Sequence, residues 1–257
     1  MDILQSLSNL YPEASKTSLR KMISQGRVRI GHEIIKKNGP LSPKQKLKIL
    51  PKRRFRQNLT IYYEDEHIVV VDKVEGLLSV ATDKKTEPSL HEYLKREFAK
   101  VWPVQRLDKA TSGVMVFALT HQAKEALKMQ FMTHDIYREY FGVVEGELLG
   151  SGTWQSKLLD DKNFVVRVHE DGQTAITHYK SLKTTKATTK VKFILETGKK
   201  NQIRVQAAEA GHPIVGDKKY GESEFSIGRL ALHAHKLGFK HPITQKKLFF
   251  ISPKPFR

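Results

Sequence analysis

Residues 104–120 read VQRLDKATSGVMVFALT and join a polar, turn-rich segment to a continuous apolar strand. Asp108 lies in the polar half, between the cations Arg106 and Lys109. Opposite charges within a few ångströms favour an ionised carboxylate, which is the form that covalent catalysis needs. Asp108 is therefore a candidate nucleophile. The alternative is a salt-bridged turn aspartate with no catalytic role, because Asp and Ser-Gly are ordinary turn residues.

The rest of the chain from residue 59 onward is mainly strand-forming. Strands are predicted at LTIYYED (59–65), HIVVVDK (67–73), GVMVFALT (113–120), REYFGVVEG (138–146), NFVVRV (163–168), AITHYKSL (175–182), KVKFILET (190–197), RLALHAHKLGF (229–239) and KLFFIS (247–252). Helices are predicted over 89–98, 122–132 and 202–210, and TTKATT (184–189) suits a hairpin tip. Without regular strand–helix alternation, this pattern predicts an α+β domain with a large, mainly antiparallel mixed sheet and flanking helices.

The first 57 residues are a separate basic segment, with 14 basic and 3 acidic side chains and thus +11 of the chain's net +18. Leu19, Met22 and Ile23 share one helix face, which Ser15 or Thr17 can cap and Gly26 can end. Short strands are expected at Val28–Ile30, Ile34–Ile35 and Leu47–Ile49, with a turn at Gly31-His32. We expect a small α/β-type RNA-binding module over 1–51, a basic linker over 52–58 and one large domain over 59–257.

Composition narrows the class of protein further. The excess of 45 Lys and Arg over 27 Asp and Glu attracts polyanions, so nucleic acid is the expected partner. No apolar run approaches the roughly 20 residues that span a bilayer, and the first residues lack the pattern of a secretory signal. The absence of cysteine excludes disulfides and thiolate chemistry. We expect a cytoplasmic protein without membrane contact.

Two further segments carry candidate functional residues. Tyr140 lies in the strand 138–146, where an aromatic is ordinarily a core residue, although beside a cleft it could stack on an extruded base. The segment ETGKKNQIRVQ (196–206) leads a turn into a helix and suits a phosphate. If Arg204 points inward, it requires a carboxylate partner, whereas an exposed helix-surface arginine requires none.

No segment predicts a cofactor or a metal site. GHPIVGDKKYG (211–221) is rich in turn residues but does not match a phosphate-binding glycine loop, and no Walker or dinucleotide motif occurs. His233 and His235 share a strand face without a third ligand at a suggestive spacing, so we expect core or interface histidines.

Six segments, in this order, resemble the RluA-type family of RNA pseudouridine synthases across residues 59–253. They are YEDEHIVVVDKVEGLLS (63–79), QRLDKATSG (105–113), REYFGVVEG (138–146), ETGKKNQIRV (196–205), GHPIVGDKKYG (211–221) and RLALHA (229–234). The basic module is similar to the alpha-L RNA-binding domain shared with a small-subunit ribosomal protein, with SLRKMISQGRVRIGHEIIK (18–36) as its core.

The resemblance implies an isomerase that converts a uridine of structured RNA to pseudouridine without a cofactor. It implies that Asp108 is the nucleophile, Arg204 its ion-pair partner and Tyr140 a contact of the target base. Arg106 would fill the space left by the flipped nucleotide, with Leu107 packed beneath. Further substrate contacts are expected from Gln202 and Ile203, and RNA contacts of the module from Lys16, Arg20, Lys21, Arg27 and Arg29.

This chain departs from the family pattern at four places. Gln105, Asn201 and Gln206 stand where histidine is common, and Val74-Glu75 stands where Pro-Ala is common. These departures bear on substrate choice and rate rather than on reaction type. Two alternatives remain: a non-catalytic RNA-binding scaffold in ribosome assembly, and another RNA enzyme such as a methyltransferase, although a glycine-rich cofactor loop is missing. The accessory module favours ribosomal over transfer RNA, and we expect a monomer.

Overall fold

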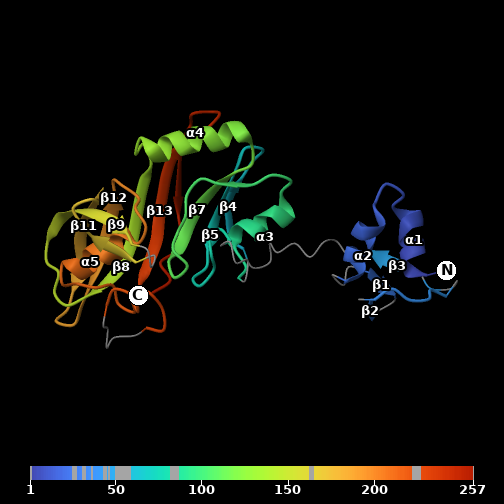
Figure 1. Ribbon diagram of the computed structural model, residues 1–257, viewed down its shortest axis with the longest axis horizontal. Coiled ribbons are helices and arrows are strands. Elements are labelled where there is room, and N and C mark those ends of the chain that lie inside the picture. The colour runs from blue at the N-terminus through green and yellow to red at the C-terminus, as the bar shows by residue number, and fades with distance from the viewer. Residues whose placement is uncertain are drawn as a thin grey trace. The chain divides into compact units, whose positions relative to one another are not determined.

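The computed structural model describes residues 2–24, 28–30, 33–35, 37–42, 45, 47–49, 59–81, 87–161, 165–221 and 227–256 of the chain. The chain divides into two compact units, residues 1–57 and 58–257, each with its own core (Figure 1). The expected linker 52–58, the helix stop at Gly26 and the turn at Gly31-His32 lie outside the described residues.

The first unit packs two helices against a small antiparallel sheet in the order β2-β1-β3. Its elements are α1 (Ile3–Leu10), α2 (Lys16–Ser24), β1 (Val28–Ile30), β2 (Glu33–Ile35) and β3 (Leu47–Ile49). Ser15 Oγ accepts a hydrogen bond from Ser18 N at 3.2 Å, so the predicted cap of α2 is confirmed. The sequence prediction missed α1, although Ile3, Leu4, Leu7 and Leu10 recur at helical spacing and Asp2 caps the helix by accepting a hydrogen bond from Gln5 N.

The second unit is built on one mixed sheet, whose described strands follow the order β10-β9-β11-β12-β8-β13-β7-β5-β4, with β14 paired to β13 and β6 to β7. The strands are β4 (Ile61–Glu64), β5 (Ile68–Lys73), β6 (Trp102–Pro103), β7 (Ser112–Ala118), β8 (Tyr137–Glu145), β9 (Ser151–Asp160), β10 (Val166–Val168), β11 (Gln173–Thr184), β12 (Thr188–Leu195), β13 (Leu232–Lys240) and β14 (Lys247–Ile251). Apart from β13 with β7, the described pairs are antiparallel, which confirms the predicted α+β fold.

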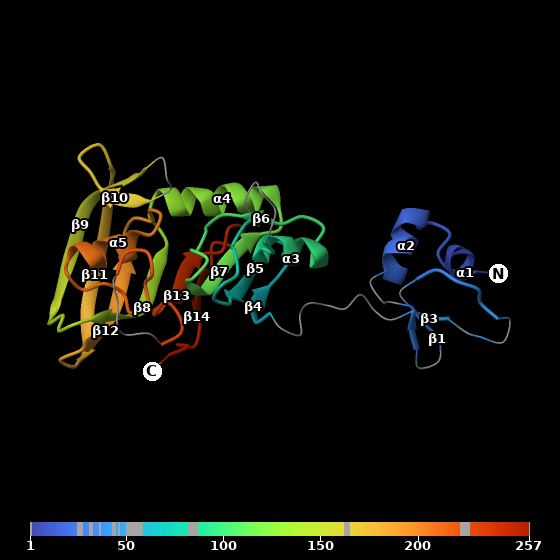
Figure 2. The ribbon, with the colours of Figure 1, turned by 60° about the horizontal axis from the view of Figure 1, so that its bottom comes forward.

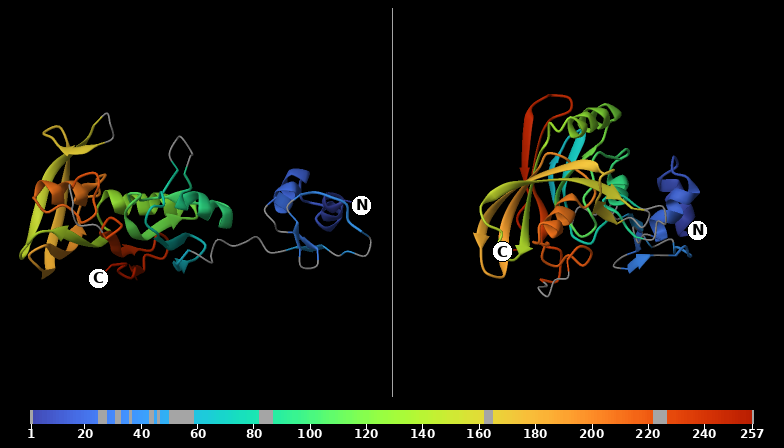
Figure 3. Two further views of the ribbon diagram at one scale, coloured as in Figure 1. Left: turned by 90° about the horizontal axis from the view of Figure 1, so that it is seen from below. Right: turned by 60° about the vertical axis from the view of Figure 1, so that its left-hand side comes forward.

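Three helices flank this sheet: α3 (Leu90–Glu97), α4 (His121–Met132) and α5 (Gln202–Glu209). All three were predicted within two residues, since Ser89 forms a capping box with Glu92 and Thr120 caps α4. Side chains of α4 pack against one face of β5 and β7, while those of α3 pack against the other face. The turned views show this arrangement (Figure 2), and show the long strands β9, β11 and β12 curving beside α5 (Figure 3).

Strand β9 was missed by the sequence prediction. Its residues SGTWQSKLLD begin with Ser-Gly and place mostly polar side chains outward, so they lack an apolar run. It pairs with β11 along its length, from Ser151 opposite Lys180 to Leu158 opposite Gln173. Cross-strand pairing rather than local propensity makes this segment a strand.

The centre of the sheet positions the polar loop 105–111. Strand β13 pairs with β8 on one side, where Ala234 faces Tyr140, and runs parallel to β7 on the other, where Ala234 faces Gly113. Gly113 has φ +121°, and a Cβ there would lie 2.2 Å from the Ala234 carbonyl oxygen. Only glycine permits this close crossing, which brings the loop that ends at Ser112 beside Tyr140.

Candidate active site

The loop that carries Asp108 is fixed through its main chain. Ser79 Oγ accepts a hydrogen bond from Leu107 N at 3.0 Å and donates one to Leu107 O at 2.7 Å. Lys73, which is fully buried, donates from Nζ to the carbonyl oxygens of Lys109 at 3.2 Å and of Leu77 at 2.7 Å. Burial lowers the pKa of Lys73 to about 8. Both sides of Asp108 are therefore held by buried side chains of the neighbouring strand and turn.

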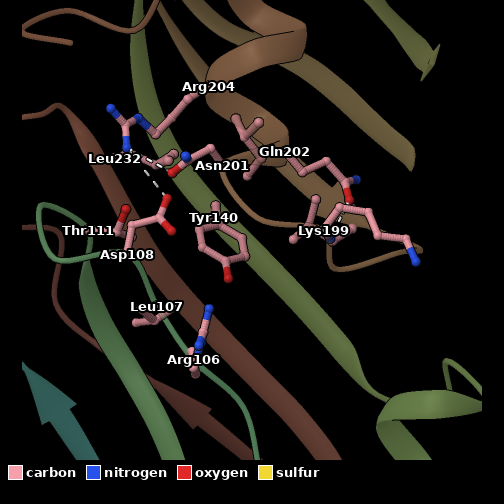
Figure 4. A pocket seen from close by; sticks show the side chains of 12 residues that line it. Arg106, Leu107, Asp108, Thr111, Tyr140, Lys199, Asn201, Gln202, Arg204 and Leu232 are labelled. Atoms are coloured by element: carbon pink, nitrogen blue, oxygen red, sulfur yellow. Dashed lines mark hydrogen bonds and ion pairs between the residues drawn. The ribbon is translucent and has the colours of Figure 1, made fainter. Parts of the chain in front are cut away.

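Arg204 faces Asp108 from the first turn of α5 and points inward, as the carboxylate-partner hypothesis required. Its Nη1 lies 3.7 Å from Asp108 Oδ2, but its closer partner is Asp217. Nε and Nη2 each donate to the Asp217 carboxylate at 2.7 Å, and Nη1 donates to Asn201 Oδ1 at 2.9 Å. The guanidinium carbon also lies 5.1 Å from the centroid of the Tyr220 ring. The guanidinium orientation is thus set by Asp217 and Asn201, leaving Nη1 turned toward Asp108 (Figure 4).

The electrostatics of Asp108 differ from the sequence-based expectation. Burial raises the pKa of Asp108, against the lowering effects of the positive charges of Arg204, Lys73 and Arg106. The expectation that its two sequence neighbours keep it ionised was wrong for Lys109, whose Nζ pairs with Glu87 at 2.6 Å. The cation nearest to Asp108 comes from α5 instead.

Tyr140 lies in the same hollow, on β8 (Figure 4). Burial raises the pKa of its hydroxyl to about 12, so the phenol keeps its proton at neutral pH. Tyr140 therefore offers a ring face and a hydroxyl donor rather than a phenolate base.

The hollow that contains Asp108, Tyr140 and Arg204 also brings together the other predicted site residues of this unit. Its lining residues are Arg106, Leu107, Asp108, Thr111, Tyr140, Leu195, Lys199, Asn201, Gln202, Ile203, Arg204 and Leu232. Arg106 is exposed at its rim and Leu107 is buried, as the proposed positions required. The Gln202 amide is occupied by protein groups, accepting from Lys199 N at 2.9 Å and donating to Ile176 O at 3.0 Å.

The predicted RNA contacts of the basic module lie in the first unit. Lys16 and Arg20 are exposed on α2, one turn apart, and share one helix face. Arg29 lies half-buried on β1. Arg27 lies outside the described residues, as does the side chain of Lys21.

Sequence reasoning missed Asp217 and Lys73. Asp217 is almost fully buried, and the segment GHPIVGDKKYG contains no other acidic residue. Because a buried arginine needs a carboxylate, this segment could have been searched for the partner of Arg204. Lys73 ends the apolar strand IVVVDK, and a lysine in such a run is itself a signal of a buried cation.

The two histidines on β13, His233 and His235, are hydrogen-bonded to protein groups. His233 is buried, and its Nδ1 is 2.8 Å from Ser112 Oγ. His235 Nδ1 is hydrogen-bonded to the carbonyl oxygen of Ser252. Among the described residues, no group of three His, Asp or Glu side chains could hold a metal ion, and none of the described helices is long and apolar enough to cross a membrane.

The sequence of the large unit matches a known enzyme family. Residues 67–209, more than half of the chain, match the family described as RNA pseudouridylate synthase. The chain belongs to the RluA family of RNA pseudouridine synthases and is an isomerase that modifies RNA. Family membership decides against the methyltransferase alternative.

Named relatives agree with this assignment. The ribosomal large subunit pseudouridine synthase D of Xylella fastidiosa is 33% identical over 278 residues, covering 97% of this chain and 84% of the relative. The dual-specificity RNA pseudouridine synthase RluA of Pasteurella multocida is 36% identical over 206 residues, covering 77% of this chain and 94% of the relative. The structure of human RNA pseudouridylate synthase domain containing 1 shares the fold, with a TM-score of 0.66 at 24% identity over 78% of this chain and 85% of that one.

Proposed function

We propose that the chain isomerises a specific uridine of ribosomal RNA, with Asp108 as the nucleophile. The observation that carries this proposal is the partly buried Asp108 carboxylate, 3.7 Å from an Arg204 guanidinium whose other nitrogens are already engaged, in a hollow shared with Tyr140. Arg204 favours the carboxylate form that a nucleophile needs, while burial leaves that carboxylate poorly solvated.

The proposed reaction needs only these groups and the RNA. Asp108 attacks the sugar or the base, the glycosidic bond to nitrogen breaks, and the uracil turns and rejoins through carbon as the bond to Asp108 breaks. The proton lost from that carbon is balanced by the proton that the freed ring nitrogen gains, so Asp108 is regenerated. Tyr140 presents its ring face to the base and keeps its proton, because its pKa is about 12. Rotation of the uracil within the pocket is easier against a flat, uncharged ring than against a charged side chain, which would hold the base in one orientation.

Arg106 and Leu107 are proposed to act on the RNA stack rather than in bond making. Extruding a stacked uridine costs roughly a few kcal/mol, which an inserted side chain and a fitted pocket can offset. Arg106 is exposed next to the pocket and Leu107 is buried beneath it. A long side chain anchored by a buried neighbour is suited to fill the vacated position.

The assignment to ribosomal RNA is supported by the basic module. The large-subunit relative aligns over 97% of this chain, which must include most of residues 1–57, whereas the dual-specificity relative aligns over 77%. We propose that residues 1–51 are an alpha-L RNA-binding domain. The family match starts at residue 67 and does not include this module.

Purified protein incubated with separate large-subunit ribosomal RNA and transfer RNA transcripts is expected to form pseudouridine in the ribosomal transcript alone. Mapping of pseudouridine in each RNA after the reaction measures this. Product in transfer RNA only would overturn the ribosomal assignment while leaving the isomerase assignment intact.

Deleting residues 1–50 is expected to weaken binding to ribosomal RNA and to flatten its salt dependence. Each neutralised phosphate of a single strand contributes about 0.7 to the slope of log affinity against log salt. In the full chain, Lys16→Gln with Arg20→Gln should lower the slope by about 1.4 if both side chains contact phosphate. Filter binding at several salt concentrations checks both. A slope unchanged by the deletion would show that the module does not bind RNA.

A further inference from the structure

A second hollow lies beside the hollow that contains Asp108 and Tyr140, and Arg204 lines both. It has a volume of about 550 Å³, within the range of small-molecule sites. Its charged lining residues outside the Arg204–Asp217 pair are Glu75, Lys109, Lys218, Lys219 and Arg229. Because Lys109 is paired with Glu87, the charge balance is three cations, Lys218, Lys219 and Arg229, against the one carboxylate of Glu75. With the Arg204–Asp217 pair neutral, the hollow has a net positive charge. We call it the Arg229 hollow.

Arg229 is held rigidly at the edge of this hollow. Its Nη2 donates to Ser112 Oγ at 2.7 Å, and its guanidinium carbon lies 5.3 Å from the centroid of the Phe256 ring. Its Nε lies 3.2 Å from Glu75 Oε2. Ser112 directly follows the loop that carries Asp108, so Arg229 is fixed to the same part of the molecule as the nucleophile.

Lys218 and Lys219 are brought to the hollow by a close contact between two loops. Gly216 has φ +76°, and a Cβ there would lie 2.1 Å from the carbonyl oxygen of Arg229. The turn 214–221 therefore rests directly on the backbone at Arg229, and both lysines are exposed next to it. The amides of Lys219 and Tyr220 donate to the Asp217 carboxylate, so the side chains of this turn supply the positive charge.

Glu75 disfavours an anion in the hollow. Its side chain is about one-third exposed, and its pairing with Arg229 occupies a guanidinium that would otherwise be available to a phosphate. Arginine binds phosphate and carboxylate with the same fork of donors, so the two anions compete. The pair is partly buried, with the Arg229 side chain 17% and the Glu75 side chain 31% exposed, so a phosphate that displaces Glu75 must replace its charge-assisted contact with Arg229.

We propose that the Arg229 hollow binds a phosphodiester group of the RNA strand beside the flipped uridine, and that this phosphate displaces Glu75 from Arg229. The proposal rests on the proposed function, since it assumes that the neighbouring pocket holds the target uridine. Arg229, Lys218 and Lys219 are the phosphate ligands. Glu75 weakens RNA binding because it competes with the phosphate for Arg229.

The test compares four full-length proteins with the wild type for binding to fluorescent decauridylate at several salt concentrations. Arg229→Gln should weaken binding and lower the slope of log affinity against log salt by up to about 0.7, the contribution of one phosphate of a single strand, and Lys218→Gln with Lys219→Gln should do the same because they contact that same phosphate. Glu75→Gln should have the opposite sign, with binding tightened about threefold at low salt because a repulsive charge is removed. The matched control is Lys246→Gln with Lys247→Gln, an exposed adjacent pair at the start of β14, opposite the end of β13. This control should change the salt slope less than either Arg229→Gln or the Lys218 and Lys219 double variant does.

The proposal requires that Glu75→Gln strengthens RNA binding and that Arg229→Gln weakens it. A pair with only a structural role would make both variants bind more weakly, and that result overturns the proposal. Equal binding by all five proteins, whether weak or strong, also overturns it. Pseudouridine formation is measured on the same wild-type preparation. An inactive wild type contradicts the proposed function, whereas an active wild type with indifferent variants contradicts the Arg229 hollow alone.

Discussion

Asp108→Asn is expected to abolish pseudouridine formation, with a loss of at least about a thousandfold, while RNA affinity and folding are retained. Asparagine has the shape of aspartate but is not a nucleophile, and removal of a covalent nucleophile commonly costs this much or more. The measurement is single-turnover conversion of the ribosomal transcript, with filter binding alongside. Loss of affinity as large as the loss of activity would contradict the nucleophile assignment.

The same variant carries a stability prediction. Burial raises the pKa of Asp108, so the folded state binds its proton more tightly than the unfolded chain does. The charged carboxylate therefore costs folding free energy once the pH exceeds its unfolded pKa of about 3.9. Asp108→Asn should leave the unfolding free energy at pH 7 unchanged or higher, and the acidic limb of the wild-type single-turnover profile should lie above that pKa. A large destabilisation would show that the Arg204 pair outweighs burial.

Asp217→Asn is expected to lower the unfolding free energy by about 3–5 kcal/mol, because it leaves the Arg204 guanidinium buried without its bidentate partner. Burial raises the pKa of Asp217, but the hydrogen bonds and charge of Arg204 outweigh this and lower it, so its stabilisation is lost as the pH falls below about 3.9. Denaturant unfolding at pH 7 measures the loss.

The control for this variant is Asp160→Asn. Asp160 also receives a close cation, Lys200 at 2.8 Å, but its side chain is 44% exposed. Exposed ion pairs contribute about 0–1 kcal/mol to the unfolding free energy, so Asp160→Asn is expected to change it little. If the two variants lose equal stability, Asp217 is not the main support of Arg204.

In Asp217→Asn, Arg204 should also turn toward Asp108 and lower the pKa of Asp108, so residual activity should persist to lower pH than in the wild type.

Local signals in the sequence predicted the secondary structure of the large unit well. Ser89 with Glu92 and Thr120 are capping residues, and α3 and α4 begin directly after Ser89 and Thr120. The apolar runs of β5, β7 and β12 are strands that bury one or both faces. These features could be predicted because they depend on residues within one turn or one strand. Strand β9 could not be predicted in this way, because it depends on pairing with β11 across the sheet.

The site could be predicted in its members but not in its electrostatics. Asp108, Tyr140 and Arg204 were identified from the resemblance, and the structure places them in one hollow. The counterion of Asp108 was not predicted correctly, because adjacent residues of an extended loop point in different directions. Lys109 turns away from Asp108 and pairs with Glu87. The pairing of Arg204 with Asp217 joins a helix to a later loop, and neither segment alone specifies it.

The most direct test of Asp108 as the nucleophile of an RNA pseudouridine synthase is pseudouridine mapping on total cellular RNA. Three cell lines are compared: one with the gene intact, one with it deleted, and one with the deletion complemented by Asp108→Asn. The account predicts a uridine in ribosomal RNA whose modification disappears on deletion and is not restored by the variant. Restoration of that site by Asp108→Asn, at the same protein level, would contradict it.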